Sequence, residues 1–360
     1  MTPPTIPIYR VAGSHREVGA QMGEIGRAQI RESVDGSFQE LPPGRTRQQQ
    51  LALAAGYRAV TEARLPWLLE ELDACADAAG VERLPFFAST MEEIWYEPAA
   101  QATQGRCSDL VAGPRATANG HLLVGHTNDL RPEAENEIVG LEISVTDEPV
   151  IFQLGGVPWL SVGWNSAGLS LTGNELSPND ERVGISRSHQ VLAMMRARSL
   201  DEMIAMSLWP DRASSYNNVL ADSEGRVANV EGSATDAEVT GLDDDGHLVH
   251  TNHYACDRMV PFEGDPAYAK RSAVRLERGR ALLAAAPPGS VTAEGLRTML
   301  ADHETKPDSI CRHPEFGYPT DKTVFWCVAD VTEGRITFGR GNPCDSEAQT
   351  YAFADHPDAG

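Results

Sequence analysis

The sequence predicts an α+β fold in which layers of antiparallel sheet are covered by helices. Three observations lead to this prediction. The first hundred residues carry apolar side chains at roughly helical spacing. From Cys107 onward the chain changes to short apolar or alternating runs separated by turn residues, which is typical of strands. Helical segments then interrupt the strand runs, and this mixture favours sheets packed under helices.

Helices account for most of the N-terminal part. They are expected at 14–34, 46–81 and 86–96. Ser14 is the expected N-cap of the first helix. Pro66 marks a boundary within the second segment, and Gly80 ends it. Four nearby glycines lack the spacing of a phosphate-binding loop, so close helix packing is their expected use: Gly13, Gly19, Gly23 and Gly26.

The strands are expected in the remainder of the chain. Five runs stand out, at 107–113, 121–129, 138–146, 149–156 and 168–174. Two hairpins follow, each bending at Glu-Gly-Arg, at 216–231 and 324–340. The interrupting helices are expected at 189–208, 265–286 and 292–304. No linker separates a second independent unit, so one structural domain is expected.

Composition restricts the classes of partner. The formal net charge of −22 repels phosphate backbones and anionic lipid surfaces, so neither nucleic acid nor a membrane is an expected partner. No apolar run reaches the length of a membrane span, and the N-terminus lacks the pattern of a signal peptide. A cytoplasmic location is therefore expected. The six cysteines have no framework spacing and are expected to be reduced thiols.

Five polar clusters stand out against this background. They are Gly-Arg-Cys-Ser-Asp at 105–109, Gly-His-Thr-Asn-Asp at 125–129, the run 163–174, His-Thr-Asn-His at 250–253 and Ser-Ile-Cys-Arg-His at 309–313. Each has a purely structural explanation when it is taken alone. Asn-Ser-Ala-Gly is a good turn, the histidines of the fourth cluster could be hydrogen-bonded core residues, and Arg312 could be a surface charge.

Taken together and in this order, the clusters resemble those of the acyl-coenzyme A:isopenicillin N (6-aminopenicillanic acid) acyltransferase family, peptidase family C45. The resemblance runs from 13–23 through these clusters to 331–344 and so covers nearly the whole chain. It implies a self-cleaving enzyme with the N-terminal-nucleophile hydrolase fold, a four-layer αββα sandwich. Residues 1–106 would then form a helical small subunit, and 107–360 the catalytic region.

The resemblance also implies roles for single residues. Cys107 would be the nucleophile, and Asp129 would orient the α-amine that cleavage liberates. Asn174 would donate to the oxyanion of the tetrahedral intermediate, and Asn252 would contact the amine or the oxyanion. Arg312 would act electrostatically on the region of the thiol.

Two positions depart from the family pattern. Arg106, before the predicted cleavage point, stands where the penicillin enzyme has glycine, and a bulky residue there restricts the backbone. His126 stands where related bile-salt hydrolases carry arginine and the penicillin enzyme glutamine. His126 and Asn165 are expected to contact the substrate, with a preference that differs from those relatives.

The chemistry explains why a thiol stands alone in mid-chain. No base is adjacent to Cys107 in the sequence. If the bond between Arg106 and Cys107 is cut, Cys107 gains an α-amine with an unperturbed pKa of about 7.7–8.0, which can accept the proton of its own thiol. One residue then supplies both nucleophile and base. The expected reaction is amide hydrolysis or N-acyl transfer on a small amide, peptide or thioester.

Three alternatives stay open at this stage. The chain could bind zinc, through His250, His253 and Cys256 or through His303, Cys311 and His313. It could be a non-catalytic binding protein on the same fold. It could also be an uncut cysteine hydrolase with His250 or His253 as the base.

The expected partners follow from the self-cleaving interpretation. A small-molecule amide, peptide or acyl donor is the expected substrate. No cofactor is expected, although a coenzyme A thioester could serve as acyl donor. The two cleavage fragments would form a heterodimer, alone or within a larger oligomer.

Overall fold

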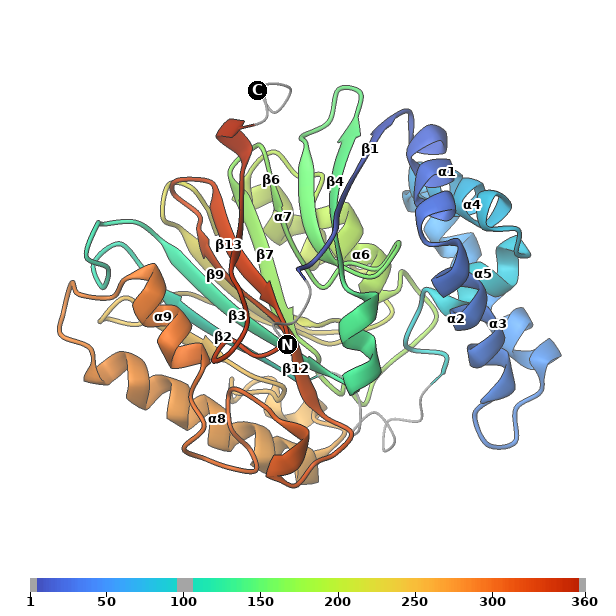
Figure 1. Ribbon diagram of the computed structural model, residues 1–360. Coiled ribbons are helices and arrows are strands. Elements are labelled where there is room, and N and C mark those ends of the chain that lie inside the picture. Colours follow the sequence, from blue (N-terminus) through green and yellow to red (C-terminus); the bar gives the residue numbers. More distant parts are fainter. Residues whose placement is uncertain (1–4, 96–105, 356–360) are drawn as a thin grey trace.

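Two stacked sheets form the centre of the molecule (Figure 1). The computed structural model describes residues 5–95 and 106–355. The eight-stranded sheet has the order β1-β4-β5-β6-β7-β8-β9-β10, and the six-stranded sheet has the order β11-β2-β3-β12-β13-β14. All the neighbouring strands run antiparallel except β1 and β4, which are parallel.

The bounds of the strands follow chain order. In the eight-stranded sheet they are β1 (Ile8–Gly13), β4 (Val139–Val145), β5 (Ile151–Gly155), β6 (Val162–Asn165), β7 (Leu169–Asn174), β8 (Asn217–Asp222), β9 (Val227–Gly232) and β10 (Ala237–Thr240). In the six-stranded sheet they are β2 (Arg106–Ala112), β3 (Leu123–Leu130), β11 (His247–His250), β12 (Lys322–Asp330), β13 (Arg335–Arg340) and β14 (Gln349–Ala352).

Helices cover the outer face of each sheet. On the eight-stranded sheet they are α1 (His15–Ile25), α2 (Arg27–Gln39), α3 (Arg47–Arg64), α4 (Pro66–Ala79), α5 (Arg83–Ser89), α6 (Arg187–Met194) and α7 (Leu200–Ser207). On the six-stranded sheet they are α8 (Pro266–Ala285) and α9 (Ala293–Leu300). The predicted αββα sandwich is confirmed. No helix among residues 5–95 and 106–355 combines the length and hydropathy that crossing a bilayer requires.

Strand alternation decides which side chains face the space between the sheets. Val111 of β2 packs in the apolar cluster shared by the two sheets, whereas Leu110 and Ala112 pack against α8 and α9. Because successive strand residues point to opposite faces, Cys107 and Asp109 share the inward side with Val111. The sandwich therefore directs the thiol of Cys107 toward the eight-stranded sheet.

The sequence identified most elements but missed several strands, among them β1, β6, β10 and β14. The hairpins β8–β9 and β12–β13 turn as predicted, with Gly225 and Gly334 at positive φ. Residues Ile8–Gly13, however, form β1, which pairs with β4 at the edge of the eight-stranded sheet. The sequence did not predict this strand, because a six-residue edge strand is stabilised by a partner far along the chain. The helix predicted at 86–96 corresponds to α5, which ends earlier, at Ser89.

Candidate active site

Cys107 lies on the wall of a cavity between the two sheets. The cavity encloses about 200 Å³ and has walls from both halves of the sandwich. Cys107 and Asn128 contribute from the six-stranded sheet, and Thr172 and Asn174 contribute from β7 of the eight-stranded sheet. Cys107 is only 6% exposed, so the cavity is the space from which its thiol can be reached.

The main-chain nitrogen of Cys107 is held by Asn252. It donates to Asn252 Oδ1 over 2.8 Å, and Asn252 Nδ2 donates to the carbonyl oxygen of Glu175. Asn128 Nδ2 lies 3.5 Å from Cys107 Sγ and also donates to Ser161 Oγ. Asn252 therefore contacts the same nitrogen that cleavage would turn into the α-amine.

Arg275 is a buried residue of the site that the sequence interpretation missed. From α8, its Nη1 donates to the carbonyl oxygen of Cys107 over 2.6 Å and to Ser108 Oγ over 2.8 Å. Its Nη2 donates to Asn252 Oδ1 over 2.9 Å. A signal was available, because Arg275 interrupts the apolar face that Tyr268, Leu276 and other buried residues form along α8.

Asp129 lies beside the predicted cleavage point but on the opposite face of β3 from Asn128. Strand β3 pairs with β2 so that Asp129 stands opposite Arg106. Its carboxylate accepts from Thr323 Oγ1 over 2.6 Å and forms an ion pair with Arg312 at 3.3 Å. Burial raises the pKa of Asp129, and the positive charges of Arg312 and Arg275 oppose that rise.

Arg312 pairs with carboxylates. It is 2% exposed in its side chain and lies within 3.5 Å of Asp129, Asp308 and Asp321. The resemblance implied that Arg312 acts on the thiol region, and in the structure its ion pair is with Asp129. The guanidinium that contacts Cys107 itself belongs to Arg275.

Asn174 presents one satisfied and one unsatisfied half of its amide. Its Oδ1 lies 2.8 Å from Nδ1 of His250 and accepts from Asn217 Nδ2 over 3.4 Å. The other ring nitrogen of His250 lies 3.0 Å from Glu231 Oε1. Asn174 Nδ2 is buried without a hydrogen-bond partner among the described residues, on the wall of the cavity that Cys107 also lines.

The environment of Cys107 disfavours a thiolate in the uncut chain. Burial raises the pKa of the Cys107 thiol well above its usual value, the carboxylates of Asp129 and Asp109 raise it further, and Arg275 opposes them. Within the described ranges, no histidine nitrogen forms a hydrogen bond with Cys107 Sγ. His250 is held between Asn174 and Glu231, and His253 contacts Ser272. No hydrogen bond among the described residues therefore supports the alternative in which a histidine acts as the base for Cys107.

The structure places two predicted substrate residues away from the cavity. His126 is fully buried in β3, where its Nδ1 lies 2.9 Å from Asp109 Oδ1. Asn165 donates to the carbonyl oxygens of Met195 and Ala197, and its Oδ1 accepts from two backbone amides of its own turn. These contacts fix the turn between β6 and β7.

The first predicted set of metal ligands does not converge. Among the groups of possible ligands found in the described part of the chain, none contains His250, His253 or Cys256. His250 is engaged with Asn174 and Glu231, which leaves neither ring nitrogen free. The second set does converge and lies outside the cavity.

Comparisons with known proteins give a family and distant structural neighbours. The sequence model of a family described as acyl-coenzyme A:6-aminopenicillanic acid acyl-transferase matches residues 115–345. No curated protein matches the sequence. Two mutant forms of the conjugated bile acid hydrolase from Clostridium perfringens are similar in structure, with TM-score 0.48 and identities of 11% and 13%, over 71% of this chain and 94% of theirs. Penicillin V acylase from Agrobacterium tumefaciens has TM-score 0.40 and 13% identity, over 65% and 82%.

Proposed function

Because the chain belongs to the acyl-coenzyme A:6-aminopenicillanic acid acyl-transferase family, we propose that it transfers the acyl group of a small amide or thioester through Cys107, after cutting itself before that residue. The family and the αββα sandwich make it an acyltransferase or amide hydrolase of the N-terminal-nucleophile class. One observation carries the finer proposal. Cys107 and Asn174 line the same cavity, and the amide nitrogen of Asn174 has no hydrogen-bond partner among the described residues.

Self-cleavage would proceed as an N-to-S acyl shift. The sulfur of Cys107 attacks the carbonyl carbon of Arg106, and the peptide C–N bond breaks as a thioester forms. The displaced nitrogen keeps its proton, takes up the thiol proton and becomes the α-amine. Water then hydrolyses the thioester, which leaves a carboxylate on Arg106 and a free thiol on Cys107.

The residues around the backbone nitrogen suit the amine that results. Asn252 Oδ1 already accepts a hydrogen bond from that nitrogen, and it could accept one from an amine in the same place. Asp129 stands opposite Arg106 on the paired strand and would be close to the new charge. The amine would then remove the thiol proton, which burial otherwise holds firmly.

In turnover, the thiolate would attack the substrate carbonyl and form an acyl-enzyme. Asn174 Nδ2 would stabilise the negative charge of the tetrahedral intermediate, since no group in the described part of the chain competes for its hydrogen bond. The leaving amine or thiol would take the proton that the α-amine received from Cys107. Water as acceptor gives hydrolysis, and an amine as acceptor gives N-acyl transfer.

The cavity wall favours a substrate with an apolar acyl group. Five apolar side chains line it beside Cys107: Leu130, Trp159, Leu160, Leu171 and Val191. Burying apolar surface contributes about 25 cal/mol per Å², so an apolar acyl chain would gain affinity from these contacts. Glu92 and Glu175 add polar groups on the same wall.

Intact-mass spectrometry and a denaturing gel of the purified protein test the proposal. The unmodified protein should give pieces of 106 and 254 residues. Cys107→Ala should remain one uncut chain without activity, because the variant lacks the sulfur. Cys256→Ser, altered at a half-buried cysteine outside the cavity lining, is the matched control and should be cut and active.

The possible outcomes distinguish self-cleavage from the role of Cys107 as the nucleophile. An acyl-transfer probe that reacts with thiols should label the N-terminus of the 254-residue piece. A Cys107→Ala variant that is still cut and active would overturn the whole assignment. An unmodified protein that is active as one uncut chain would overturn self-cleavage while leaving Cys107 as the nucleophile.

A further inference from the structure

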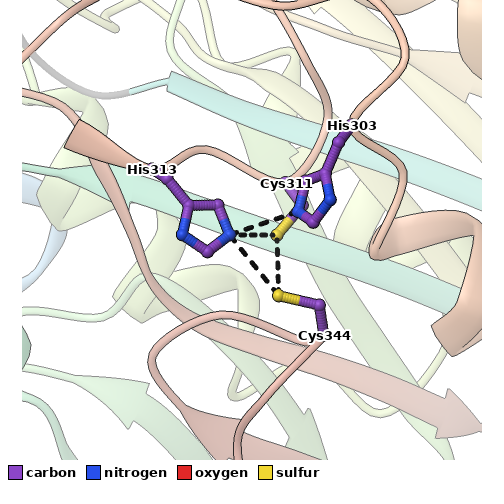
Figure 2. A group of neighbouring side chains, drawn as sticks. All are labelled: His303, Cys311, His313 and Cys344. Atoms are coloured by element: carbon purple, nitrogen blue, oxygen red, sulfur yellow. Dashed lines mark hydrogen bonds between the residues drawn. The ribbon is translucent and has the colours of Figure 1, made fainter. Parts of the chain in front are cut away.

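Four metal-ligating side chains meet at a place that the acyl-transfer site does not use. His303 follows α9, Cys311 and His313 stand before the short helix η4 (Pro314–Phe316), and Cys344 follows β13. One ligand atom from each lies within 4.8 Å of the others. Figure 2 shows the two thiols and the ring of His313 turned toward one another, with His303 beside them.

Hydrogen bonding alone does not explain why these atoms converge. Nε2 of His313 lies 3.2 Å from Nε2 of His303, 3.6 Å from Cys311 Sγ and 3.4 Å from Cys344 Sγ. A single ring nitrogen can donate one hydrogen bond or accept one, so three such neighbours exceed its capacity. A cation at the centre would satisfy all four atoms at once.

The separations between the atoms are those of a tetrahedral zinc site. Zinc bonds of about 2.3 Å to sulfur and about 2.05 Å to nitrogen give tetrahedral edges of about 3.8 Å between sulfurs, about 3.6 Å between sulfur and nitrogen and about 3.3 Å between nitrogens. The observed distances are 3.8 Å between Cys311 Sγ and Cys344 Sγ, 3.6 and 3.4 Å from the sulfurs to His313, and 3.2 Å between the imidazoles.

We propose that His303, Cys311, His313 and Cys344 form a zinc site that is independent of acyl transfer. Two thiolates with two imidazoles in a tetrahedron select Zn²⁺ among the common divalent ions. The protein fills all four positions, which is the arrangement of a structural site, since a catalytic site keeps one position for water or substrate. The binding of Zn²⁺ displaces the protons of the two thiols.

A neighbouring residue supports the ligands. Asn342 Nδ2 lies 3.3 Å from Cys311 Sγ and donates to the carbonyl oxygen of Arg312 over 2.6 Å. Outer contacts of this kind orient ligands and affect metal affinity by about ten- to a hundredfold. Three of the four ligands were noted in the sequence, and the fourth, Cys344, comes from a distant turn that only the fold brings near.

The site would fasten the segment that carries Arg312. Arg312 stands between the ligands Cys311 and His313, and its backbone nitrogen donates to Thr323 Oγ1 over 2.9 Å. A bound ion would tie this segment and the loop after α9 to the turn after β13. Because a cation that binds only the folded state adds to stability, its removal should lower the melting temperature.

Metal analysis of the full-length protein tests the proposal. Protein purified without added chelator should contain about one zinc per chain. After removal of zinc, added Co²⁺ should give the strong visible absorption of a tetrahedral thiolate complex, and Zn²⁺ should displace it. Cys344→Ser changes an exposed ligand and should fold, yet lose most of the bound zinc and this absorption.

The control is Cys256→Ser, which removes a half-buried cysteine outside the cluster and should keep the full zinc content. Circular dichroism of each variant checks folding, and His303→Gln provides a second ligand variant. A protein without zinc that gives no tetrahedral Co²⁺ spectrum would overturn the proposal. So would a folded Cys344→Ser variant that keeps one zinc per chain, or a disulfide between Cys311 and Cys344 under reducing conditions.

Discussion

At the scale of single residues, Asn174 has partners for its amide oxygen but none among the described residues for its amide nitrogen. His250 and Asn217 engage the oxygen, so the nitrogen must point away from them and toward the cavity. A buried amide nitrogen without a partner costs free energy in the resting protein. That cost would be recovered when an oxyanion forms, which is the condition for catalysis by preferential binding of the transition state.

Replacing Asn174 should therefore slow the chemistry. Asn174→Ala is expected to lower kcat by about 100- to 1000-fold, with a smaller change in KM, since one oxyanion donor typically contributes that much. Steady-state kinetics on the best substrate measures both constants. A fall in kcat of less than about tenfold would remove Asn174 from the reaction.

Asn165→Ala is the matched control, because this asparagine is also buried in the eight-stranded sheet. Its four hydrogen bonds all go to the backbone, so its removal should lower the melting temperature and leave kcat close to that of the unmodified protein. The two asparagines should thus separate into one that affects turnover and one that affects stability.

Buried histidines predict how stability responds to acid. Burial lowers the pKa of His189 to about 4, and its Nε2 contacts Thr90 while Nδ1 has no partner among the described residues. Burial likewise lowers the pKa of His253 to about 4. In the unfolded chain each of them is protonated near pH 6.5. Their contribution to the free energy of unfolding should therefore be fully present above that pH and decrease as the pH falls toward 4.

Denaturant unfolding at several pH values checks this prediction. The Cys107→Ala background keeps one chain, so that unfolding can be reversible. In that background His189→Gln should reduce the loss of stability between pH 6.5 and pH 4, by an amount on the order of 3 kcal/mol, while His253 retains its own share. Equal pH dependence in the two proteins would contradict the assignment to His189.

At the scale of elements, the contact between α1 and α4 depends on glycines. A Cβ on Gly19 would lie 2.1 Å from the carbonyl oxygen of Glu71, and one on Gly23 would lie 2.3 Å from that of Cys75. Both positions meet backbone, which cannot move aside cheaply. The prediction of close helix packing is therefore confirmed for Gly19 and Gly23, whereas Gly13 ends strand β1 and a Cβ on Gly26 would meet the side chain of Val157.

Gly23→Ala should destabilise the protein by about 1–3 kcal/mol, because the helices must separate to admit the methyl group. Gly36→Ala is the matched control on α2, where a Cβ would meet nothing within 4 Å. The control should be neutral or stabilising by up to about 1 kcal/mol, since alanine is the better helix former. Thermal unfolding of both variants measures the difference, and similar effects would show that the crossing tolerates side chains.

Local sequence predicted the elements whose signals are local. The capping box at Ser14, the boundary at Pro66 and the left-handed cap at Gly80 all lie where the sequence suggested. Strand β1 was not predicted, because its partner β4 is more than a hundred residues away in the sequence. Arg275 and Cys344 were not predicted either, because their contacts with Cys107 and Cys311 depend on how the fold brings separate segments together.

At the scale of the whole molecule, the proposed cut before Cys107 would divide the chain but not the core. Strand β1, before the division, pairs with β4 after it over six residues. Helices α1 to α5 share one apolar cluster with strands β4, β5 and β7 and with helices α6 and α7. Layers that bury each other's apolar faces would hold together without a covalent link.

Glu93 adds a polar connection across the same division. Its carboxylate accepts from Ser186 Oγ, from the backbone nitrogen of Arg187 and from Ser214 Oγ, all over 2.7–2.8 Å. Burial tends to raise the pKa of Glu93, but Arg187 and these hydrogen bonds outweigh it and lower the pKa. The carboxylate is therefore ionised at neutral pH, with its partners supplied by the other side of the division.

The two fragments should consequently stay together after cleavage. In size-exclusion chromatography at neutral pH they are expected to elute as one species, at the volume of the uncut Cys107→Ala chain, and to separate only in denaturant. Separation would require the helical layer to leave the eight-stranded sheet, which would expose the apolar cluster to water. It would also break the hydrogen bond between Glu93 and Ser186. Elution of the 106-residue piece by itself without denaturant would mean that this interface is too weak to form a lasting heterodimer.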